Sequence, residues 1–367
     1  MNPQSQHAEL STSTAEELFF DRVAQIVDAG AVSIMLSIGH RLGLFDTLAK
    51  LPPSTSAQIA EAGELAERYV REWLAVMVVA DIIVYDAVSK TYQLPAEHAA
   101  CLTRNAPAGN LAVYAQFVAM AGATEVPLLE CFETGEGLSY ADYPCFHQIM
   151  SEDSNQTVAA NVGNILAELS PEMSSRLEKG IDVLDAGCGL GMTLVAMAKL
   201  FPSSRFTGYD LCADVISSAR QAAFRQGLDN VHFDVVDLAS WETSSEFDLI
   251  TSFDAVHDTS DPQELLKRVH AALRPSGVHL MQDIGGSAHL ENNRDFPFAA
   301  LLYTMSTVHC TPVSLAQNGK GLGTMWGWET AERMLQAAGF QHIERHVVPD
   351  DPMNVWFVSR KSAQSHD

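Results

Sequence analysis

The stretch that decides the fold class is Val183–Gly191, which reads VLDAGCGLG. A short apolar run, Ile181–Ala186, leads into its three glycines, and apolar residues at helical spacing follow from Leu194 to Leu200. This order predicts a buried strand, a tight turn and a helix whose N-terminus faces a ligand. Glycines at such a turn let the backbone approach the ligand closely.

Around this stretch, short apolar runs alternate with helix-like segments, which is typical of a parallel sheet covered on both faces. The predicted strands are Ile181–Ala186, Arg205–Asp210, Val231–Asp237, Phe247–Phe253 and Val278–Asp283. Beyond them, Gln341–Val348, the turn PDDP at residues 349–352 and Asn354–Ser359 predict an antiparallel hairpin. The fold class is therefore α/β, with a Rossmann-like and mostly parallel sheet.

The glycine spacing and three acids indicate the class of ligand. The glycines follow G-x-G-x-G, whereas a dinucleotide fingerprint is G-x-G-x-x-G. Asp185, Asp210 and Asp237 end three successive predicted strands, whose carboxyl ends meet at one crevice. A phosphate would be a poor neighbour for three carboxylates. S-adenosylmethionine, which carries an ammonium and a sulfonium but no phosphate, suits them.

The glycine loop and the strand-end acids resemble those of class I S-adenosylmethionine-dependent methyltransferases. The resemblance implies a seven-stranded sheet with one antiparallel strand, S-adenosyl-L-methionine as cofactor and S-adenosyl-L-homocysteine as product. The residues that it assigns to the cofactor are Asp185, Gly187, Gly189, Gly191, Asp210, Leu211, Asp237, Leu238, Phe253 and Met150.

Residues 253–262, FDAVHDTSDP, resemble the His-Asp motif of small-molecule O-methyltransferases. The resemblance implies that His257 is the general base, followed by Asp258, and that Asp283 orients the imidazole. Thr259 stands where that family commonly has an aromatic residue, so the local packing does not carry over. The alternative interpretation is structural, with His257 at a helix start capped by Asp258, and Asp283 as a turn residue.

Two further segments are candidates for the acceptor pocket. Residues 143–150, YPCFHQIM, resemble the Phe-x-x-x-Met stretch of O-methyltransferases, which implies that Phe146 and Met150 touch donor or acceptor; a core stripe at i, i+4 is the alternative. The second segment is an insertion at residues 286–328. The predicted pocket residues are Phe146, His147, Tyr303, His309 and Trp326. Because the separation of His257, His309 and Cys310 is unknown from sequence, no metal is predicted.

The N-terminal third of the chain has a helical pattern in place of the alternating strands and helices. Apolar residues at helical spacing from Leu18 to Leu48 predict a long helix that ends before Pro52 and is covered in a subunit interface. Segments Ser56–Glu61, Glu67–Val79 and Ile82–Tyr92 follow in the order of a winged helix. Between residues 55 and 95 six acids outnumber three bases, which favours a structural or dimerising role over DNA binding.

The amino-acid composition indicates which binding partners and which cell compartment to expect. The 367 residues hold 22 Lys and Arg against 46 Asp and Glu, a net charge of -24, so nucleic acid and anionic membranes are poor partners. Six cysteines without a CxxC pair fit a reducing cytoplasm. We expect a soluble protein with no leader and no membrane helix, since no run of about 20 apolar residues occurs.

The order of segments from Val32 to Arg360 also resembles winged-helix-fused bacterial methyltransferases. We expect a flexible start (1–17), a winged-helix dimerisation domain (18–105), a helical linker (106–179) and a cofactor domain (180–367). The predicted activity is methylation of a small molecule, at a hydroxyl oxygen, by a homodimer joined through its N-terminal helices. The alternatives are a nitrogen or sulfur acceptor, other chemistry on the same donor, and a winged-helix regulator that only senses the cofactor.

Overall fold

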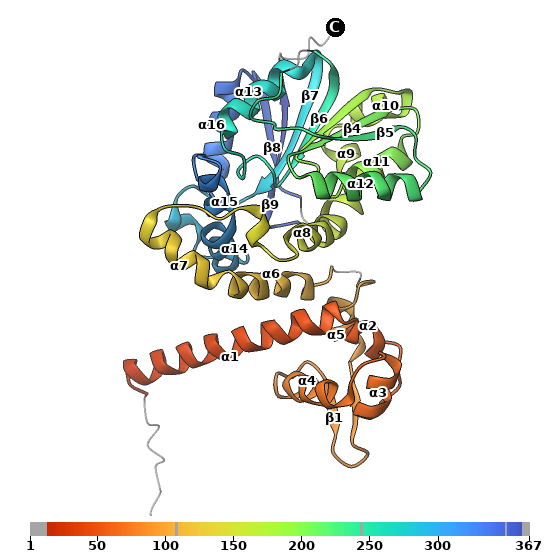
Figure 1. The fold of residues 1–367 in the computed structure, drawn as a ribbon, viewed down its shortest axis with the longest axis vertical. Coiled ribbons are helices and arrows are strands. Elements are labelled where there is room, and N and C mark those ends of the chain that lie inside the picture. Colours follow the sequence, from red (N-terminus) through yellow and green to blue (C-terminus); the bar gives the residue numbers. More distant parts are fainter. Residues whose placement is uncertain (1–12, 107–108, 243–244, 349–350, 362–367) are drawn as a thin grey trace, which may run out of the picture. The chain divides into compact units, whose positions relative to one another are not determined.

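A computed structural model describes residues 13–106, 109–242, 245–348 and 351–361. The chain divides into two compact units, Met1–Val118 and Ala119–Asp367, each with its own core (Figure 1). Most of the flexible start predicted for residues 1–17, and Pro349 and Asp350 of the predicted turn, lie outside the described residues.

Two helices open the first unit where the sequence pattern predicted one. Helix α1, Ala15–Arg41, begins at a capping box in which Thr14 and Glu17 exchange hydrogen bonds. It ends at Arg41, with Leu42 as its C-cap, because Gly43 adopts a left-handed conformation (φ 69°). The short helix α2, Leu44–Leu48, follows. The prediction of an unbroken helix to Leu48 was therefore wrong, since apolar periodicity continues across the break.

Helix α1 exposes most of its apolar surface within its own unit. Phe19 and Phe20 are 69% and 73% exposed, and Ile26 and Val27 are exposed as well. By length and composition alone, α1 is apolar enough to cross a membrane, as are α6 and α7 when counted together as one bent span. The expectation that no segment could span a membrane is thus not confirmed.

The rest of the first unit has the winged-helix order predicted from sequence. Helices α3 (Ser56–Ala62) and α4 (Glu67–Val79) precede a two-stranded antiparallel ribbon, β1 (Val84–Asp86) and β2 (Thr91–Gln93), and helix α5 (Ala96–Leu102). Trp73 of α4 anchors this core, because its ring packs on Phe45 and its indole N–H donates to Met35 O at 2.8 Å.

A run of helices connects the winged helix to the sheet. These are α6 (Ala112–Ala123), which contains the unit boundary, α7 (Glu125–Thr134), the 3-10 turn η1 (Tyr140–Asp142), α8 (Phe146–Ser154), the π-helix η2 (Asn155–Ala159), α9 (Val162–Leu169) and α10 (Pro171–Lys179). Helices thus make up most of the segment predicted as a helical linker, residues 106–179.

The second unit is built on a seven-stranded sheet in the order β5-β4-β3-β6-β7-β9-β8 (Figure 1). The first four pairings along this order are parallel, whereas β9 pairs antiparallel with both β7 and β8. The strands are β3 (Asp182–Ala186), β4 (Arg205–Asp210), β5 (Val231–Val235), β6 (Phe247–Phe253), β7 (Leu273–Ile284), β8 (His342–His346) and β9 (Asn354–Arg360). The predicted fold class is confirmed.

Helices cover both faces of this sheet. They are α11 (Met192–Leu200), α12 (Ala213–Arg225), α13 (Pro262–Ala272) and α16 (Trp328–Ala338). Neighbouring strand residues point to opposite faces, so Val183 packs in the core that contains α11 and α12, and Leu184 in the core that contains α13 and α16. A sheet buried on both faces explains why its strands read as continuous apolar runs.

Two strand limits differ from the sequence prediction. Strand β5 ends at Val235, so Asp237 lies two residues beyond the strand rather than at its end. Strand β7 begins at Leu273, five residues before the predicted start, with a register shift opposite Phe247 and Leu249. The first residues of β7 include the polar Arg274 and Ser276, so the apolar pattern that predicts a strand begins only at Val278.

The insertion after β7 is folded and mainly helical. It contains the 3-10 turn η3 (Leu290–Asn293), α14 (Ala299–Met305), the π-helix η4 (Ser306–Cys310) and α15 (Thr311–Ala316). Single π-turns inside α-helices occur frequently at functional sites. Here the π-turn carries His309 and Cys310, both buried.

Candidate active site

The glycine loop, residues 187–191, turns the chain between β3 and α11. Its three glycines have positive φ angles of 86°, 51° and 71°, a conformation that other residues adopt only with strain. A Cβ atom on Gly191 would lie 2.5 Å from the ring of Phe233, so this glycine is required by packing. A Cβ on Gly189 would meet nothing within 4 Å, so at this point the backbone borders open space.

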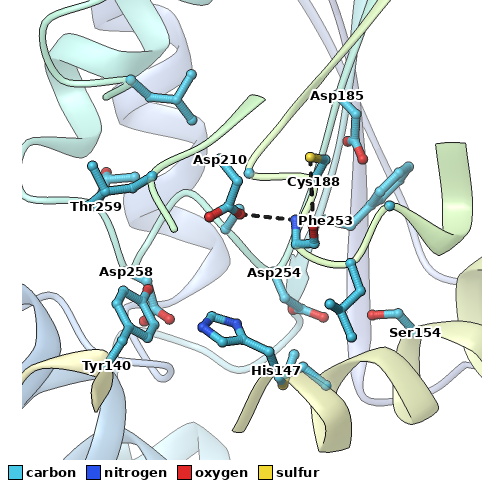
Figure 2. A pocket seen from close by; sticks show the side chains of 18 of the residues that line it. Tyr140, His147, Ser154, Asp185, Cys188, Asp210, Phe253, Asp254, Asp258 and Thr259 are labelled. Atoms are coloured by element: carbon cyan, nitrogen blue, oxygen red, sulfur yellow. Dashed lines mark hydrogen bonds between the residues drawn. The ribbon is translucent and has the colours of Figure 1, made fainter. Parts of the chain in front are cut away.

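Asp210, the last residue of β4, braces this loop. Its Oδ2 accepts a hydrogen bond from the Gly189 N–H at 2.9 Å, and its Oδ1 accepts one from the Cys212 N–H at 2.9 Å. Figure 2 shows the contact between Asp210 and the loop beside the cavity. The second-strand acid thus fixes the loop as well as facing the cavity.

Asp185, the acid of β3, is buried beneath the loop. Its Oδ1 accepts a hydrogen bond from the Thr251 hydroxyl at 2.8 Å. Burial raises the pKa of Asp185 to about 7; the Thr251 bond opposes this rise and the charge of Asp210 adds to it. A cation bound in the cavity would favour the ionised carboxylate.

A cavity borders the loop and the carboxyl ends of β3, β4 and β6. It brings together all ten residues that the sequence assigned to the cofactor: Asp185, Gly187, Gly189, Gly191, Asp210, Leu211, Asp237, Leu238, Phe253 and Met150. Asp237, although beyond its strand, still borders the cavity and accepts the Ala239 N–H at 2.9 Å.

The charge of the cavity wall decides which ligands fit. The described residues that line it include five aspartates, Asp185, Asp210, Asp237, Asp254 and Asp258, and neither lysine nor arginine. A phosphate group would find carboxylates where it needs cations. An adenosyl ligand with a sulfonium and an ammonium fits, since carboxylates can accept hydrogen bonds from ribose hydroxyls and balance its positive charge.

At the other end of the cavity lies the His257 cluster, which we define as His257, Asp258, Asp283 and Cys310. The Nδ1 atom of His257 lies 2.9 and 3.0 Å from the two oxygens of Asp283, and Nε2 lies 3.3 Å from Oδ1 of Asp258. Burial alone would lower the pKa of His257, but the two carboxylates raise it well above its usual value. The resting ring therefore favours the imidazolium form.

Asp258 is the member of this cluster that borders the cavity, whereas His257 and Asp283 lie behind it. Asp283 is fixed from another direction, because Oδ1 accepts the indole N–H of Trp326 at 3.0 Å. Trp326 thus holds Asp283 and does not line this cavity. The sequence placed these residues near one another but gave no sign of the Trp326 contact.

The remaining predicted pocket residues separate into two groups. Phe146 and His147 line the cavity, as does Met150. His309 does not line it; its ring stacks on Phe146 at a centroid distance of 3.7 Å, and burial lowers its pKa to about 4. Tyr303 accepts a hydrogen bond from the Asn293 amide at 2.8 Å and lies apart from the cavity.

Several cavity residues were not predicted from the sequence, among them Tyr140 and Asp254. Tyr140 borders the cavity from η1, and its ring stacks on His147 (Figure 2). Asp254 has a positive φ of 48°, an unusual conformation for a non-glycine residue, and receives a hydrogen bond from Gln282 at 3.1 Å. Burial and the charge of Asp283 raise its pKa well above the usual value. Its place directly after Phe253 was the available signal.

Comparison with known families agrees with this division of the chain. Residues 30–104 match the Rv2258c-like winged HTH domain, and residues 177–339 match a methyltransferase domain. The second unit contains a methyltransferase domain. The first contains a winged helix.

Curated relatives match about a third of this chain and less than half of their own length. A trans-aconitate 2-methyltransferase from Variovorax paradoxus is 30% identical over 127 residues, 34% of this chain and 44% of the relative. A ubiquinone biosynthesis O-methyltransferase from Coxiella burnetii is 32% identical over 128 residues, 35% and 49% respectively. The chain thus spans less than half the length of these relatives.

Solved structures match nearly the whole chain in fold. A putative O-methyltransferase from Nostoc punctiforme superposes with a TM-score of 0.71 at 21% identity, covering 95% of this chain and 100% of that one. A mitomycin 7-O-methyltransferase gives 0.67 at 17% identity, covering 94% and 99%. Human N-acetylserotonin methyltransferase gives 0.64 at 17% identity, covering 96% and 100%. The winged helix and the methyltransferase domain therefore form a known combination of folds.

Proposed function

We propose that this protein transfers the methyl group of S-adenosyl-L-methionine to a hydroxyl oxygen of a small molecule, leaving S-adenosyl-L-homocysteine. The observation that carries this proposal is the cavity, in which a glycine loop with five aspartates lies next to a buried histidine. The methyltransferase-domain match supports the reaction class. The O-methyltransferase names of several relatives favour oxygen as acceptor.

The glycine loop and Asp210 would hold the cofactor, with Asp185, Asp237 and Met150 beside it. The cofactor supplies an electrophilic methyl group. The protein supplies a cavity without cationic side chains among its described lining residues, and so it does not oppose the positive charge of the sulfonium. Tyr140, Phe146 and His147 offer aromatic surface for a flat acceptor.

His257 is proposed as general base and Asp283 as its positioning residue. Their contact of 2.9 Å fixes the ring so that Nε2 points toward Asp258, the residue that borders the cavity. Because the resting ring carries a proton on Nε2, that proton must first pass to Asp258 or to solvent. An acceptor hydroxyl must then take the place of the Asp258 carboxylate before Nε2 can receive the hydroxyl proton. Asp258 would then move toward the cavity.

The test is the His257→Ala variant, assayed by cofactor-dependent release of S-adenosyl-L-homocysteine with a panel of hydroxylated aromatic acceptors. Loss of a general base lowers turnover by about 10²–10⁴-fold. Cofactor affinity, measured by calorimetry, should stay near the wild-type value. Near-full turnover in the variant would overturn the base role.

An amine acceptor is the second candidate, since Asp254 and Asp258 border the cavity and could accept hydrogen bonds from the N–H groups of an uncharged amine. The same variant separates the two. An uncharged amine needs no strong base to attack carbon, so turnover with amine acceptors should survive the loss of His257 far better than turnover with hydroxyl acceptors.

We also propose that the protein is a cytoplasmic homodimer joined through α1. The exposed apolar side chains of α1, among them Phe19 and Phe20, need a covering surface. None of the six cysteines is in a disulfide bond, as expected for a reducing compartment. Light scattering should give twice the chain mass of 39.9 kDa. The Phe20→Asp variant should shift the protein toward one chain mass, and a monomeric wild type would overturn the proposal.

A further inference from the structure

We propose that His257, Asp258 and Cys310 form a binding site for a divalent transition metal of the zinc type. A ring nitrogen of His257, a carboxylate oxygen of Asp258 and Sγ of Cys310 lie within 4.8 Å of one another, and all three residues are buried. From the sequence no metal was predicted, because the separation of His257, His309 and Cys310 was unknown; the structure places Asp258 rather than His309 with the other two. The proposal concerns metal binding and stands independently of the proposed function.

The donor set matches what zinc prefers. Zinc binds imidazole nitrogen, thiolate sulfur and carboxylate oxygen at about 2.0–2.3 Å, usually with four ligands in a tetrahedron. Two ligand atoms of such a tetrahedron lie roughly 3.3–3.6 Å apart. The 3.3 Å between Nε2 of His257 and Oδ1 of Asp258 already has this value. Three protein ligands leave a fourth position, and Asp258 joins the cluster to the cavity.

A second set of contacts orients two of the three ligands. Nδ1 of His257 is held by Asp283, the carboxylate–histidine arrangement that fixes the ring in most metal sites. Sγ of Cys310 lies 2.8 Å from the Thr324 hydroxyl, which can donate to a thiolate. The π-helix η4 places Cys310 at this point, although it is 53 residues (310 − 257) from His257.

An unpartnered atom gives independent support. Oδ1 of Asp258 is buried and, among the residues that the structure describes, accepts no hydrogen bond; its 3.3 Å contact with Nε2 of His257 is an ion pair only while the ring is protonated, and a metal would replace that proton. A buried carboxylate oxygen without a partner is costly. A cation at the centre of the three ligands would satisfy it, and the thiolate and carboxylate together would balance a charge of +2.

Metal binding would also affect the chemistry of the cavity. Nε2 cannot bind a metal and receive a proton at the same time. Occupancy of this site would therefore remove His257 from proton transfer and leave the glycine loop unchanged.

The experiment is a titration of the full-length protein, first treated with a chelator and a thiol reductant. Zinc binding is measured by calorimetry, and cobalt(II) is added in parallel as a spectroscopic substitute. We expect about one equivalent of either metal, with a thiolate-to-cobalt charge-transfer absorption. The Cys310→Ser variant should lose this absorption, and Cys131→Ser, which removes a free cysteine in α7, should keep it.

Thr324 provides a second pair of variants that leaves all three ligands in place. Thr324→Val should weaken zinc binding by about 10–100-fold, as loss of a ligand-orienting contact does, and Thr324→Ser should restore it. The proposal is overturned if the wild-type protein takes up no metal, if cobalt gives no sulfur absorption, or if Cys310→Ser binds zinc as the wild type does.

Discussion

The glycine-loop end of the cavity and the His257 end differ in how far apart their parts lie along the chain. The glycine loop is five consecutive residues braced by Asp210, and much of its wall is backbone. The His257 cluster joins side chains from residues 257, 258, 283 and 310, with Trp326 behind them. The first end depends on local conformation and the second on packing across the domain, so variants at the two ends should fail in different ways.

The largest effect is expected for Asp185→Asn in the ligand-free protein. The pKa of Asp185 is raised from 3.8 to about 7, so the folded state keeps its proton longer than the unfolded state. The stabilisation that comes from this retained proton is fully present below pH 4. It is lost as the pH rises toward 7, which lowers the free energy of unfolding by about 4 kcal/mol.

The Asn side chain does not ionise, so the variant should be more stable than the wild type at pH 8, with a smaller gain in stability at pH 5. Urea denaturation at both pH values measures the free energy of unfolding of each protein. If the variant and the wild type differ equally in unfolding free energy at pH 5 and pH 8, Asp185 is not held protonated in the folded protein, and its ionisation does not destabilise the glycine-loop end.

The next effect separates two glycines of one loop. Gly191→Ala should cost about 3 kcal/mol of unfolding free energy, because a left-handed backbone and an overpacked Phe233 contact each add to the cost. Gly189 also has a positive φ angle, but a Cβ there would meet no neighbouring atom, so Gly189→Ala should cost about 1–2 kcal/mol of unfolding free energy. Thermal unfolding of the pair checks this, and equal losses would contradict the packing argument.

A smaller effect, on binding rather than folding, is expected for Asp210→Ala. Removing a carboxylate that braces the loop should weaken S-adenosyl-L-homocysteine binding by roughly 30-fold, about 2 kcal/mol. Calorimetry measures it. Glu246→Ala serves as control, since this residue is exposed and does not line the cavity. Unchanged affinity in Asp210→Ala would remove the acid from the cofactor site.

These two ends also show how far sequence reasoning reaches. Strands β4 and β6 were predicted with their exact limits, and all ten assigned cofactor residues border one cavity, because their positions follow from local turns and strand ends. Asp237 was predicted as the last residue of its strand, because the apolar Val236 follows β5 without a break. Tyr303 and His309 were placed at the cavity but lie away from it, because only packing of the insertion decides which side chains face inward.

The smallest effect tests the His257 end. Trp326→Phe removes the indole donor to Asp283 and should cost about 1 kcal/mol of stability, the net value of one hydrogen bond. Urea denaturation measures it, with Trp241→Phe as a control outside the cluster. If both variants lose the same amount, the Asp283 contact contributes nothing beyond the loss of a ring.

The π-helix η4 has a consequence for how this protein can diverge. One α-helical residue turns the chain by about 100°, so deleting a single residue from Ser306–Cys310 would rotate everything after it by that angle. Cys310 would leave His257 while every other side chain of the helix stayed chemically the same. A change of one codon in length is therefore enough for a relative of this chain to gain or lose the thiol beside His257.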